Sequence, residues 1–197
     1  GIINNWFKSY LLNRTQTTEI NGYISTKDPN PYGVPQGSVL EPLLFLLFIN
    51  DITKASTKLK FFLFADDTNL LYANRNLKTL ESVVNNELIK LCDWLTANKL
   101  TLNIKKSNFV IFRPYQKKIV AQINIKLFDN GTGQYLNLEN KESVKYLGLL
   151  IDSYLSWRNQ IDYISSKLSR TVGLFAKLRH SVPQRTFITL YWSLIHS

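Results

Sequence analysis

Residues 60–73, KFFLFADDTNLLYA, form an apolar stretch that two adjacent aspartates interrupt. The aromatic and aliphatic residues on either side, 61–64 and 70–73, are typical of short buried strands. The Asp-Asp-Thr-Asn run between them favours a tight bend, because Asx side chains hydrogen-bond their own backbone. The stretch therefore predicts a hairpin that carries the carboxylates of Asp66 and Asp67 at its tip.

Two neighbouring carboxylates repel each other unless water screens them, a proton neutralises one, or a divalent cation binds them. Oxygen-only ligands suit Mg²⁺, which usually binds one or two carboxylates together with substrate phosphates. An Asp-Asp turn between strands is also common without a metal, so a plain solvated turn is the alternative. Asp66 and Asp67 are candidate Mg²⁺ ligands whose assignment depends on the neighbouring segments.

The chain is strongly basic, with 24 Lys and Arg against 14 Asp and Glu in 197 residues and a net charge of +10. Such a charge indicates a polyanionic partner. Residues 94–128 contain several Lys and Arg but no acid, and residues 158–185 contain Asp162 as their single acid. Two basic groups that exclude acids favour nucleic acid over the alternative of a solvated lysine-rich surface.

Other side chains exclude several classes of site. Cys92 is the single cysteine, which excludes an internal disulfide and fits a reducing compartment. Its place in a helical pattern favours a structural role over a reactive one. His180 and His196 are too few and too isolated to indicate zinc. The longest apolar run, 43–49, is far too short to span a bilayer. A membrane surface could also attract the basic charge, but no strongly amphipathic basic helix supports it, so no membrane partner is expected.

Periodicity gives the order of elements. Helices are predicted over residues 3–12, 77–97, 157–178 and 183–195. Strands are predicted over 109–112, 119–128, 135–138 and 144–151, with turns at Asn21-Gly22 and Asp129-Asn130-Gly131. Because no βαβ alternation repeats, this order predicts an α+β fold.

Residues 28–37 contain three prolines and two glycines, which exclude a helix or a central strand there. An apolar helix is expected to follow, with Pro42 at the first helical position, where its missing N–H costs nothing, and Glu41 as the capping residue. The alternative is a capping box from Ser38 to Glu41. It is disfavoured because it would put Pro42 where an intrahelical donor is needed.

Four segments, taken in order and spacing, resemble the reverse transcriptases of non-LTR (LINE-type) retrotransposons, particularly the jockey-like elements of animals. Residues 33–52, GVPQGSVLEPLLFLLFINDI, resemble the block that contacts template and nucleotide, and FADDT at 64–68 resembles the catalytic metal hairpin. Residues 94–112, WLTANKLTLNIKKSNFVIF, are similar to the following palm block. Residues 144–157, VKYLGLLIDSYLSW, are similar to the primer-grip block, so the resemblance covers nearly the whole chain.

The resemblance implies an α+β fold in the form of a right-hand polymerase palm followed by the start of a helical thumb. The palm is expected over residues 1–150 and the thumb over 151–197. The palm would be partial, lacking the fingers and the first palm strand, because the chain starts at Gly1 rather than Met and looks cut at both ends.

Roles for particular residues also follow from the resemblance. Asp66 would be the chief metal ligand and Asp67 its partner, with the metals aligning the primer 3′-hydroxyl against the α-phosphate of a dNTP. Gln36 and Gly37 would line the nucleotide- and template-binding pocket, with a plain structural turn as the alternative.

Three further roles are implied by the same resemblance. Lys106 matches the palm-block lysine that neutralises or protonates the leaving pyrophosphate, although a solvated lysine in a basic turn explains it equally well. Tyr146, Leu147 and Gly148 would position the primer, and a plain core strand explains Leu147 equally well. Phe64 would pack beneath the metal hairpin.

Two departures from the family pattern weigh against activity of this chain alone. The other essential metal ligand of the family, an aspartate on an earlier strand, would lie upstream of Gly1. Glu41 stands where the family usually has glycine, and a carboxylate there would repel phosphate.

The expected function is that of an RNA-directed DNA polymerase, which extends a DNA primer on an RNA template with dNTPs and Mg²⁺. The chain is expected to be an inactive fragment when isolated. The alternative is a non-catalytic, degenerate nucleic-acid-binding relic of the same fold. A group II intron enzyme or telomerase is a weaker match, because GVPQGSVL followed closely by FADDT argues against both. The family implies action in the nucleus, with the cytoplasm as the alternative, and leaves the oligomeric state open.

Overall fold

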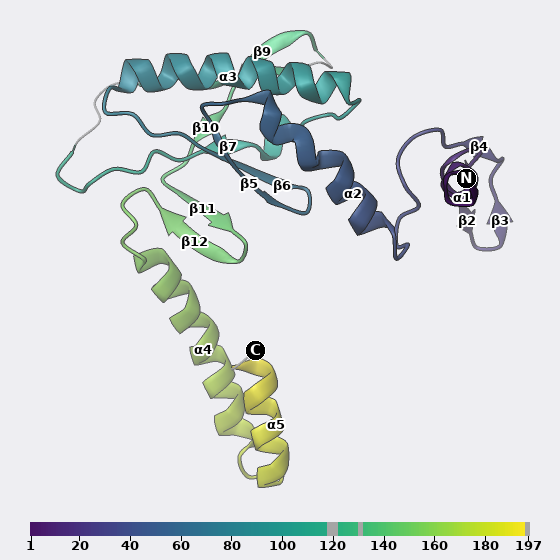
Figure 1. Cartoon of the computed structure of the whole chain (residues 1–197). Coiled ribbons are helices and arrows are strands. Elements are labelled where there is room, and N and C mark those ends of the chain that lie inside the picture. The colour runs from purple at the N-terminus through teal and green to yellow at the C-terminus, as the bar shows by residue number, and fades with distance from the viewer. Residues whose placement is uncertain (118–121, 130–131, 196–197) are drawn as a thin grey trace. The chain divides into compact units, whose positions relative to one another are not determined.

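A computed structural model describes residues 1–117, 122–129 and 132–195 (Figure 1). The chain divides into two compact units, Gly1–Ala73 and Asn74–Ser197, and each is described by itself. Both units mix helices with short strand pairs, so the mixed helix and strand character of the prediction is confirmed. Within the described ranges the strands form six two-stranded sheets.

The first unit consists of two helices, a 3-10 helix and three hairpin-like strand pairs. In order these are α1 (Ile2–Leu11), β1 (Thr15–Gln16), β2 (Glu19–Ile20), β3 (Tyr23–Ile24), β4 (Asp28–Pro29), α2 (Glu41–Ile49), η1 (Asn50–Ala55), β5 (Lys60–Phe64) and β6 (Asp67–Leu71). The predicted Asn21-Gly22 turn joins β2 to β3, with φ of 52° and 83°, as a two-residue hairpin loop requires.

The second unit begins with a long helix and ends with a pair of helices. In order its elements are α3 (Leu77–Ala97), η2 (Ile104–Lys106), β7 (Asn108–Phe109), β8 (Lys126–Asp129), β9 (Gln134–Asn137), β10 (Glu139–Asn140), β11 (Ser143–Tyr146), β12 (Leu149–Asp152), α4 (Arg158–Leu178) and α5 (Gln184–Leu194). Helices α4 and α5 lie side by side, with the rings of Phe175 and Phe187 5.3 Å apart (Figure 1).

Helix α3 carries most of the core of the second unit, and its bounds match the prediction. Asn76 caps it, because its side chain accepts hydrogen bonds from the N–H groups of Lys78 (2.9 Å) and Thr79 (3.2 Å). The helix packs against β8. The buried apolar side chains on α3, on β8 and on the segment entering β8 are Leu88, Leu91, Cys92, Leu95, Ile123, Ile125 and Leu127.

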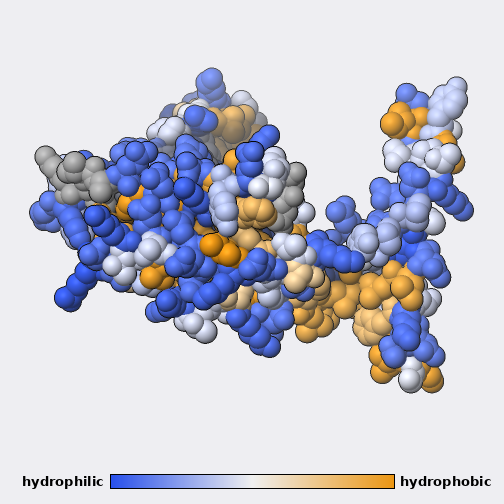
Figure 2. All heavy atoms as spheres, turned by 90° about the horizontal axis from the view of Figure 1, so that it is seen from above, coloured by the Kyte–Doolittle hydropathy of each residue, from blue (hydrophilic) through white to orange (hydrophobic). Residues whose placement is uncertain are grey.

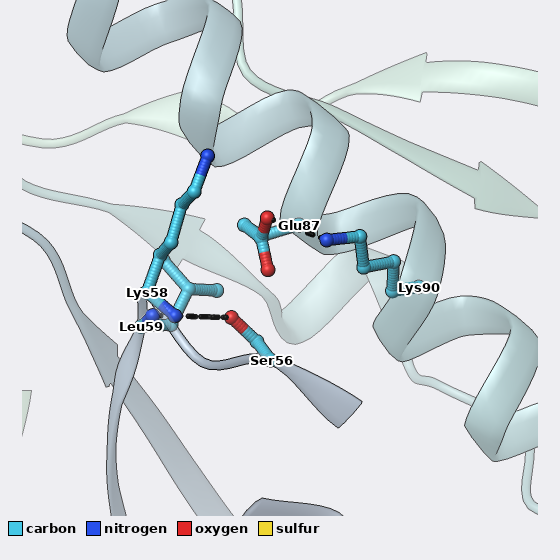
Figure 3. A network of polar contacts seen from close by, with 5 residues as sticks. All are labelled: Ser56, Lys58, Leu59, Glu87 and Lys90. Atoms are coloured by element: carbon cyan, nitrogen blue, oxygen red, sulfur yellow. Dashed lines mark hydrogen bonds and ion pairs between the residues drawn. The ribbon is translucent and has the colours of Figure 1, made fainter. Parts of the chain in front are cut away.

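Figure 3 shows one local polar contact in each unit. In the first unit the Ser56 hydroxyl accepts hydrogen bonds from the N–H groups of Lys58 (3.2 Å) and Leu59 (3.1 Å), which fixes the turn that enters β5. In the second unit the carboxylate of Glu87, a residue only 1% exposed, pairs with Lys90 Nζ at 2.8 Å along α3. Because one carboxylate oxygen has a cation 2.8 Å away, this acidic side chain is tolerated at a buried position.

Helix α2 is apolar on every side, and large side chains on it are exposed, including Leu43, Leu46, Leu47 and Phe48. Exposed hydrophobic residues are visible as orange spheres among the mostly hydrophilic surface in Figure 2. A helix without a polar face is typical of a buried segment.

In the part of the chain that the structure describes, no helix is long and apolar enough to cross a membrane.

The predicted strands differ from the observed ones in extent. The strand expected over 109–112 is the two-residue β7, because its parallel partner β10 supplies only two residues. The strand expected over 119–128 is observed as β8, which begins only at Lys126. The predicted return strand over 135–138 is β9, shifted by one residue. The start of the predicted 119–128 strand, the Asn130-Gly131 turn and His196 lie outside the described residues.

Asp152 ends β12 and organises the segment that leads into α4. Its carboxylate accepts hydrogen bonds from the backbone N–H groups of Tyr154 (2.9 Å), Ser156 (3.0 Å) and Trp157 (3.1 Å), and from the Ser156 hydroxyl (3.0 Å). Burial alone would raise the pKa of Asp152, but these hydrogen bonds outweigh it and hold the pKa below its ordinary value. The carboxylate therefore stabilises this segment in its ionised form.

The Asp152→Asn variant is expected to unfold at a lower temperature than the wild type at neutral pH, because the amide keeps one acceptor oxygen and turns a donor toward other donors. The folded pKa lies below the unfolded value of about 3.9, so the stabilisation is full above that value. It is lost as the pH falls through the folded pKa. Thermal unfolding followed by circular dichroism should show the difference between wild type and variant shrinking in acid.

The control is Asp162→Asn, which changes an exposed acid on α4. This variant should unfold like the wild type at every pH. A stability difference for Asp152→Asn that stays constant with pH would contradict the role given to the ionised carboxylate.

Candidate functional site

The β5–β6 hairpin has a tighter turn than the sequence predicts. Phe64 pairs with Asp67, so the loop consists only of Ala65 and Asp66, and Ala65 has a φ of 49°. The prediction that residues 66–69 form the bend is therefore wrong, because Asp67 already belongs to β6. Two-residue loops with positive φ match the twist of the strands they join, and the ladder here extends as far as such a loop allows.

The carboxylates at this tip are exposed and unpaired. Asp66 and Asp67 are both exposed, and neither carboxylate forms a hydrogen bond or an ion pair within the described residues. Among those residues, no group of three or more His, Cys, Asp or Glu could hold a metal ion, so the pair is the donor set that the hairpin offers. Two free carboxylates fit a hard cation such as Mg²⁺, which keeps several waters and takes further oxygens from phosphates.

The hairpin that carries these carboxylates is less buried than predicted. Phe62 is 50% exposed and Phe64 is 60% exposed. The prediction that Phe64 packs beneath the hairpin is therefore wrong. Because side chains alternate along a strand, Phe62 and Phe64 share one face of a two-stranded sheet, while Phe61 and Leu63 on the other face are half-buried.

The loop that precedes α2 is held by Arg14, a residue that lies outside every motif recognised in the sequence. Its Nη2 donates hydrogen bonds to the carbonyl oxygens of Tyr32 (2.7 Å) and Gly33 (2.6 Å). Its Nε donates to Leu11 O at 3.4 Å, at the end of α1. Arg14 and Gln36 both line a cleft of about 690 Å³ in the first unit. The other lining residues are Thr15, Gln16, Asn30, Tyr32, Gly33, Val34 and Pro35.

The start of α2 differs from the preferred prediction. The helix begins at Glu41, Leu40 is the N-cap, and Pro42 takes the second position. The Glu41 N–H donates to Ser38 Oγ at 3.2 Å, as in the capping box that was disfavoured. Pro42 is tolerated because the first four N–H groups of a helix have no intrahelical acceptor.

The carboxylate of Glu41 turns back toward the predicted nucleotide loop. It accepts a hydrogen bond from the backbone N–H of Gly37 rather than from Ser38. Gly37 has a φ of 76°, in the left-handed region that favours glycine. The backbone N–H of Gly37, a residue predicted to face the nucleotide, is therefore hydrogen-bonded to a negatively charged carboxylate.

The Gly37→Ala variant is expected to lose about 1–2 kcal/mol of stability, because an L-side chain is strained at this φ. No heavy atom lies within 4 Å of the added Cβ, so the loss comes from the backbone and not from a clash. Urea unfolding measures the change. Gly37→Asn is the matched control, because Asn tolerates the left-handed region, and its loss should be smaller. Equal losses for the two variants would contradict the assignment.

Lys106 is the last residue of η2 in the second unit, and its side chain is exposed. Its backbone N–H donates to the carbonyl oxygen of Asn103 (3.1 Å) and to Asn103 Oδ1 (3.3 Å). The ammonium group forms no ion pair within the described ranges. A pyrophosphate contact and a solvated lysine both remain compatible with this position.

The segment predicted as one strand over 144–151 is a hairpin. Tyr146 ends β11, and Leu147 and Gly148 form the two-residue loop before β12, with φ of 46° and 88°. Leu147 is 46% exposed, so the alternative that it belongs to a core strand is wrong. The three residues predicted to bind the primer thus lie at the end of one hairpin.

The predicted site residues divide between the two units. Gln36, Gly37, Asp66 and Asp67 belong to the first unit. The residues at 106 and 146–148 belong to the second unit. The assignment of these eight residues stays a prediction.

The chain matches the family model described as reverse transcriptase (RNA-dependent DNA polymerase) over residues 2–151. This match covers more than half of the chain, and the chain therefore belongs to the reverse transcriptase family. Members of this family generally use divalent metal ions and act on nucleic acids. No solved structure matches the chain significantly.

Two similar proteins of Drosophila melanogaster are named as RNA-directed DNA polymerases of mobile elements. The probable RNA-directed DNA polymerase from transposon X-element is 28% identical over 170 residues, which cover 84% of this chain and 18% of that protein. The RNA-directed DNA polymerase from mobile element jockey is 26% identical over 200 residues, which cover 95% of this chain and 21% of that protein. The chain thus spans about a fifth of their length, and the predicted resemblance to non-LTR reverse transcriptases is confirmed.

Proposed function

We propose that this chain forms part of the catalytic core of an RNA-directed DNA polymerase of a non-LTR retrotransposon. The polymerase would extend a DNA primer along an RNA template with dNTPs. The observation that carries the proposal is the pair of exposed, unpaired carboxylates of Asp66 and Asp67 at a hairpin tip in a member of the reverse transcriptase family. The names of the relatives support the same activity.

Asp66 and Asp67 would hold Mg²⁺ through their carboxylate oxygens. The bound ion would lower the charge on the phosphates and orient the reacting oxygens. Gln36 and Gly37 would contact the nucleotide from the loop that Arg14 fixes. Because Arg14 Nη2 donates to the carbonyls at residues 32 and 33, it holds this loop in one conformation before a ligand arrives.

The second unit would supply groups that bind charge and primer. Lys106 would neutralise the pyrophosphate, which its exposed ammonium group permits. Tyr146, Leu147 and Gly148 would position the primer from the β11–β12 hairpin. In this proposal residues 1–150 form a partial palm, residues 151–197 begin the thumb, and the protein acts in the nucleus.

The test is retention of a labelled dNTP on a primer–template in the presence of the chain. With oligo(dT) annealed to poly(rA), labelled dTTP should be retained on a filter in a manner that requires both Mg²⁺ and the protein. Mismatched dCTP serves as the control and should not be retained. Retention that does not depend on Mg²⁺, or that is equal for dTTP and dCTP, would refute the proposed function.

A second candidate function, that of a non-catalytic nucleic-acid-binding relic, is favoured by one observation. The Glu41 carboxylate accepts a hydrogen bond from the Gly37 N–H and places a negative charge at the predicted nucleotide loop. A Glu41→Gln variant keeps the side-chain length and one acceptor oxygen but removes the charge. If the charge blocks nucleotide binding, this variant should retain dTTP while the wild type does not.

A further inference from the structure

The second unit contains a polar cavity that the proposed catalytic residues do not use. Its volume is about 440 Å³, within the range of small-ligand sites. Arg113 and Lys141 provide positive charge in its wall, and Glu142 provides a negative one. The Lys141 ammonium group also lies 3.4 Å from a carboxylate oxygen of Glu139, on the exposed surface, so a phosphate would compete with this ion pair. Five of the remaining lining residues have side chains that can donate or accept hydrogen bonds, namely Gln122, Asn124, Asn137, Asn140 and Ser153, and the other three, Ile111, Ile123 and Leu138, are apolar.

Two tyrosine rings gather beside the arginine of this cavity. The Arg113 guanidinium lies 5.2 Å from the centre of the Tyr154 ring, within cation–π range, and its Nη2 donates a hydrogen bond to Tyr154 Oη at 3.0 Å. The ring of Tyr115 lies 5.2 Å from that of Tyr154 at an angle of 58°. Tyr115 is nevertheless 81% exposed, so most of its ring surface is open to solvent.

The backbone holds this group of side chains in place. The Asp152 carboxylate fixes the Tyr154 N–H, and the Arg113 N–H donates to Ser153 O at 3.0 Å. A turn closed from Lys117 N–H to the carbonyl of Pro114 (3.0 Å) presents Tyr115. Arg113, Tyr115 and Tyr154 therefore form a platform that exists before any ligand binds, which lowers the entropy cost of binding.

Arg113 retains an unused donor at this position. Its Nε is buried and has no hydrogen-bond partner among the described residues. A buried donor without an acceptor costs free energy, and an acceptor that reached it through a small side-chain shift would recover that cost. The segment that carries Arg113 is basic, because residues 94–128 contain no acid, so the Arg113 side of the cavity favours an anionic ligand.

We propose that Tyr115, Tyr154, Arg113 and Lys141 form a binding site for an unpaired nucleotide of a single-stranded polynucleotide. The base would stack on the open ring of Tyr115, and the phosphate would contact Arg113 and Lys141. Aromatic rings beside cations and amides match single-stranded nucleic acid, because every base offers a π-face while its phosphates offer charge. A duplex lacks a free face inside its stack, so it does not use this platform.

This site goes beyond the proposed polymerase function, since it needs neither the metal hairpin nor catalysis. Its shared ligand chemistry, an unpaired base with a phosphate, occurs in RNA, in DNA and in free nucleotides. The test therefore uses three probes with the whole chain: a labelled oligouridylate, an oligothymidylate of the same length, and UMP.

The experiment measures binding by fluorescence anisotropy, with UMP as a competitor. Tyr115→Ala should weaken binding of the single-stranded probe about tenfold, as expected for the loss of one stacked base. Tyr115→Trp should bind like the wild type, because it keeps an aromatic face. Lys141→Gln should make the negative slope of log K against log salt shallower by about 0.7, as expected for one lost phosphate contact on a single strand.

Tyr23→Ala is the matched control, because Tyr23 is 83% exposed and lies in the first unit. It should leave binding unchanged, and Tyr115→Ala should leave binding of a blunt duplex unchanged. A preference for the RNA or the DNA probe assigns the source of the strand, and either supports the site.

Three outcomes would overturn the inference: an unchanged affinity in Tyr115→Ala, an equal loss for single strand and duplex, or Tyr115-dependent binding of UMP but of neither oligonucleotide. Loss of Mg²⁺-dependent dTTP retention with intact Tyr115-dependent binding refutes the polymerase proposal alone. The reverse result refutes this site alone.

Discussion

The Asp66→Asn and Asp67→Asn variants are expected to weaken Mg²⁺-dependent retention of dTTP on the primer–template by more than about tenfold. Loss of an outer partner of a metal ligand already costs about 10–100-fold in metal affinity, and loss of a ligand charge should cost at least as much. Asn has nearly the shape of Asp and tolerates turns, so the hairpin should fold normally. The effect therefore isolates the carboxylate charge.

Binding of Mn²⁺, followed by electron paramagnetic resonance, gives a measurement that does not depend on nucleotide. Each single variant should bind Mn²⁺ more weakly than the wild type, and the double variant should bind it most weakly. Asp51→Asn is the matched control, because Asp51 is an exposed acid of the same unit outside the hairpin. If Asp51→Asn weakens Mn²⁺ binding as much as Asp66→Asn does, the hairpin is not the metal site.

The Leu91→Ala variant is expected to lose about 2–5 kcal/mol of stability, the range for truncating a buried leucine. Leu91 is 2% exposed and lies on the face of α3 that carries the other buried leucines. Removing its side chain takes apolar surface out of the core and leaves a cavity that the helix cannot close. Urea unfolding followed by far-ultraviolet circular dichroism measures the loss.

Ile89→Ala provides the comparison on the same helix. Ile89 is 41% exposed, and alanine is the better helix former, so its truncation should change stability by less than about 0.5 kcal/mol. The contrast between the two variants tests whether α3 buries the face that its periodicity predicts. Similar losses at both positions would contradict this orientation.

Elements with strong local signals could be predicted from the sequence. Helix α3 has its predicted bounds because six leucine or valine residues recur at helical spacing and Asn76 caps the start. The β2–β3 hairpin has its predicted turn because Asn21 and Gly22 both tolerate positive φ. In these segments local preference and final structure agree.

Elements that depend on pairing partners could not be predicted in detail. Residues 144–151 look like one strand by composition, but Leu147, with a φ of 46°, takes a backbone conformation that is uncommon for leucine. The bend at Ala65 was missed for the same reason, since alanine carries no turn signal. Its position follows from the pairing of β5 with β6.

The candidate site shows the same division. Asp66, Asp67, Gln36 and Gly37 were found from motifs, and their roles stay predictions. Arg14 was missed because its acceptors are main-chain carbonyls that lie 18 and 19 residues away in sequence. Long-range contacts between a side chain and the backbone leave no pattern in a single sequence.

The buried thiol of Cys92 can report local unfolding of the second unit. Its thiol is buried on α3, its Sγ–H donates to the Phe128 carbonyl at 3.9 Å, and burial raises its pKa. Because it is the single cysteine, a thiol-specific reagent can modify only molecules in which this region has separated. The rate of alkylation, compared with and without nucleic acid, would report whether a bound strand suppresses local unfolding of the second unit. No engineered label is required.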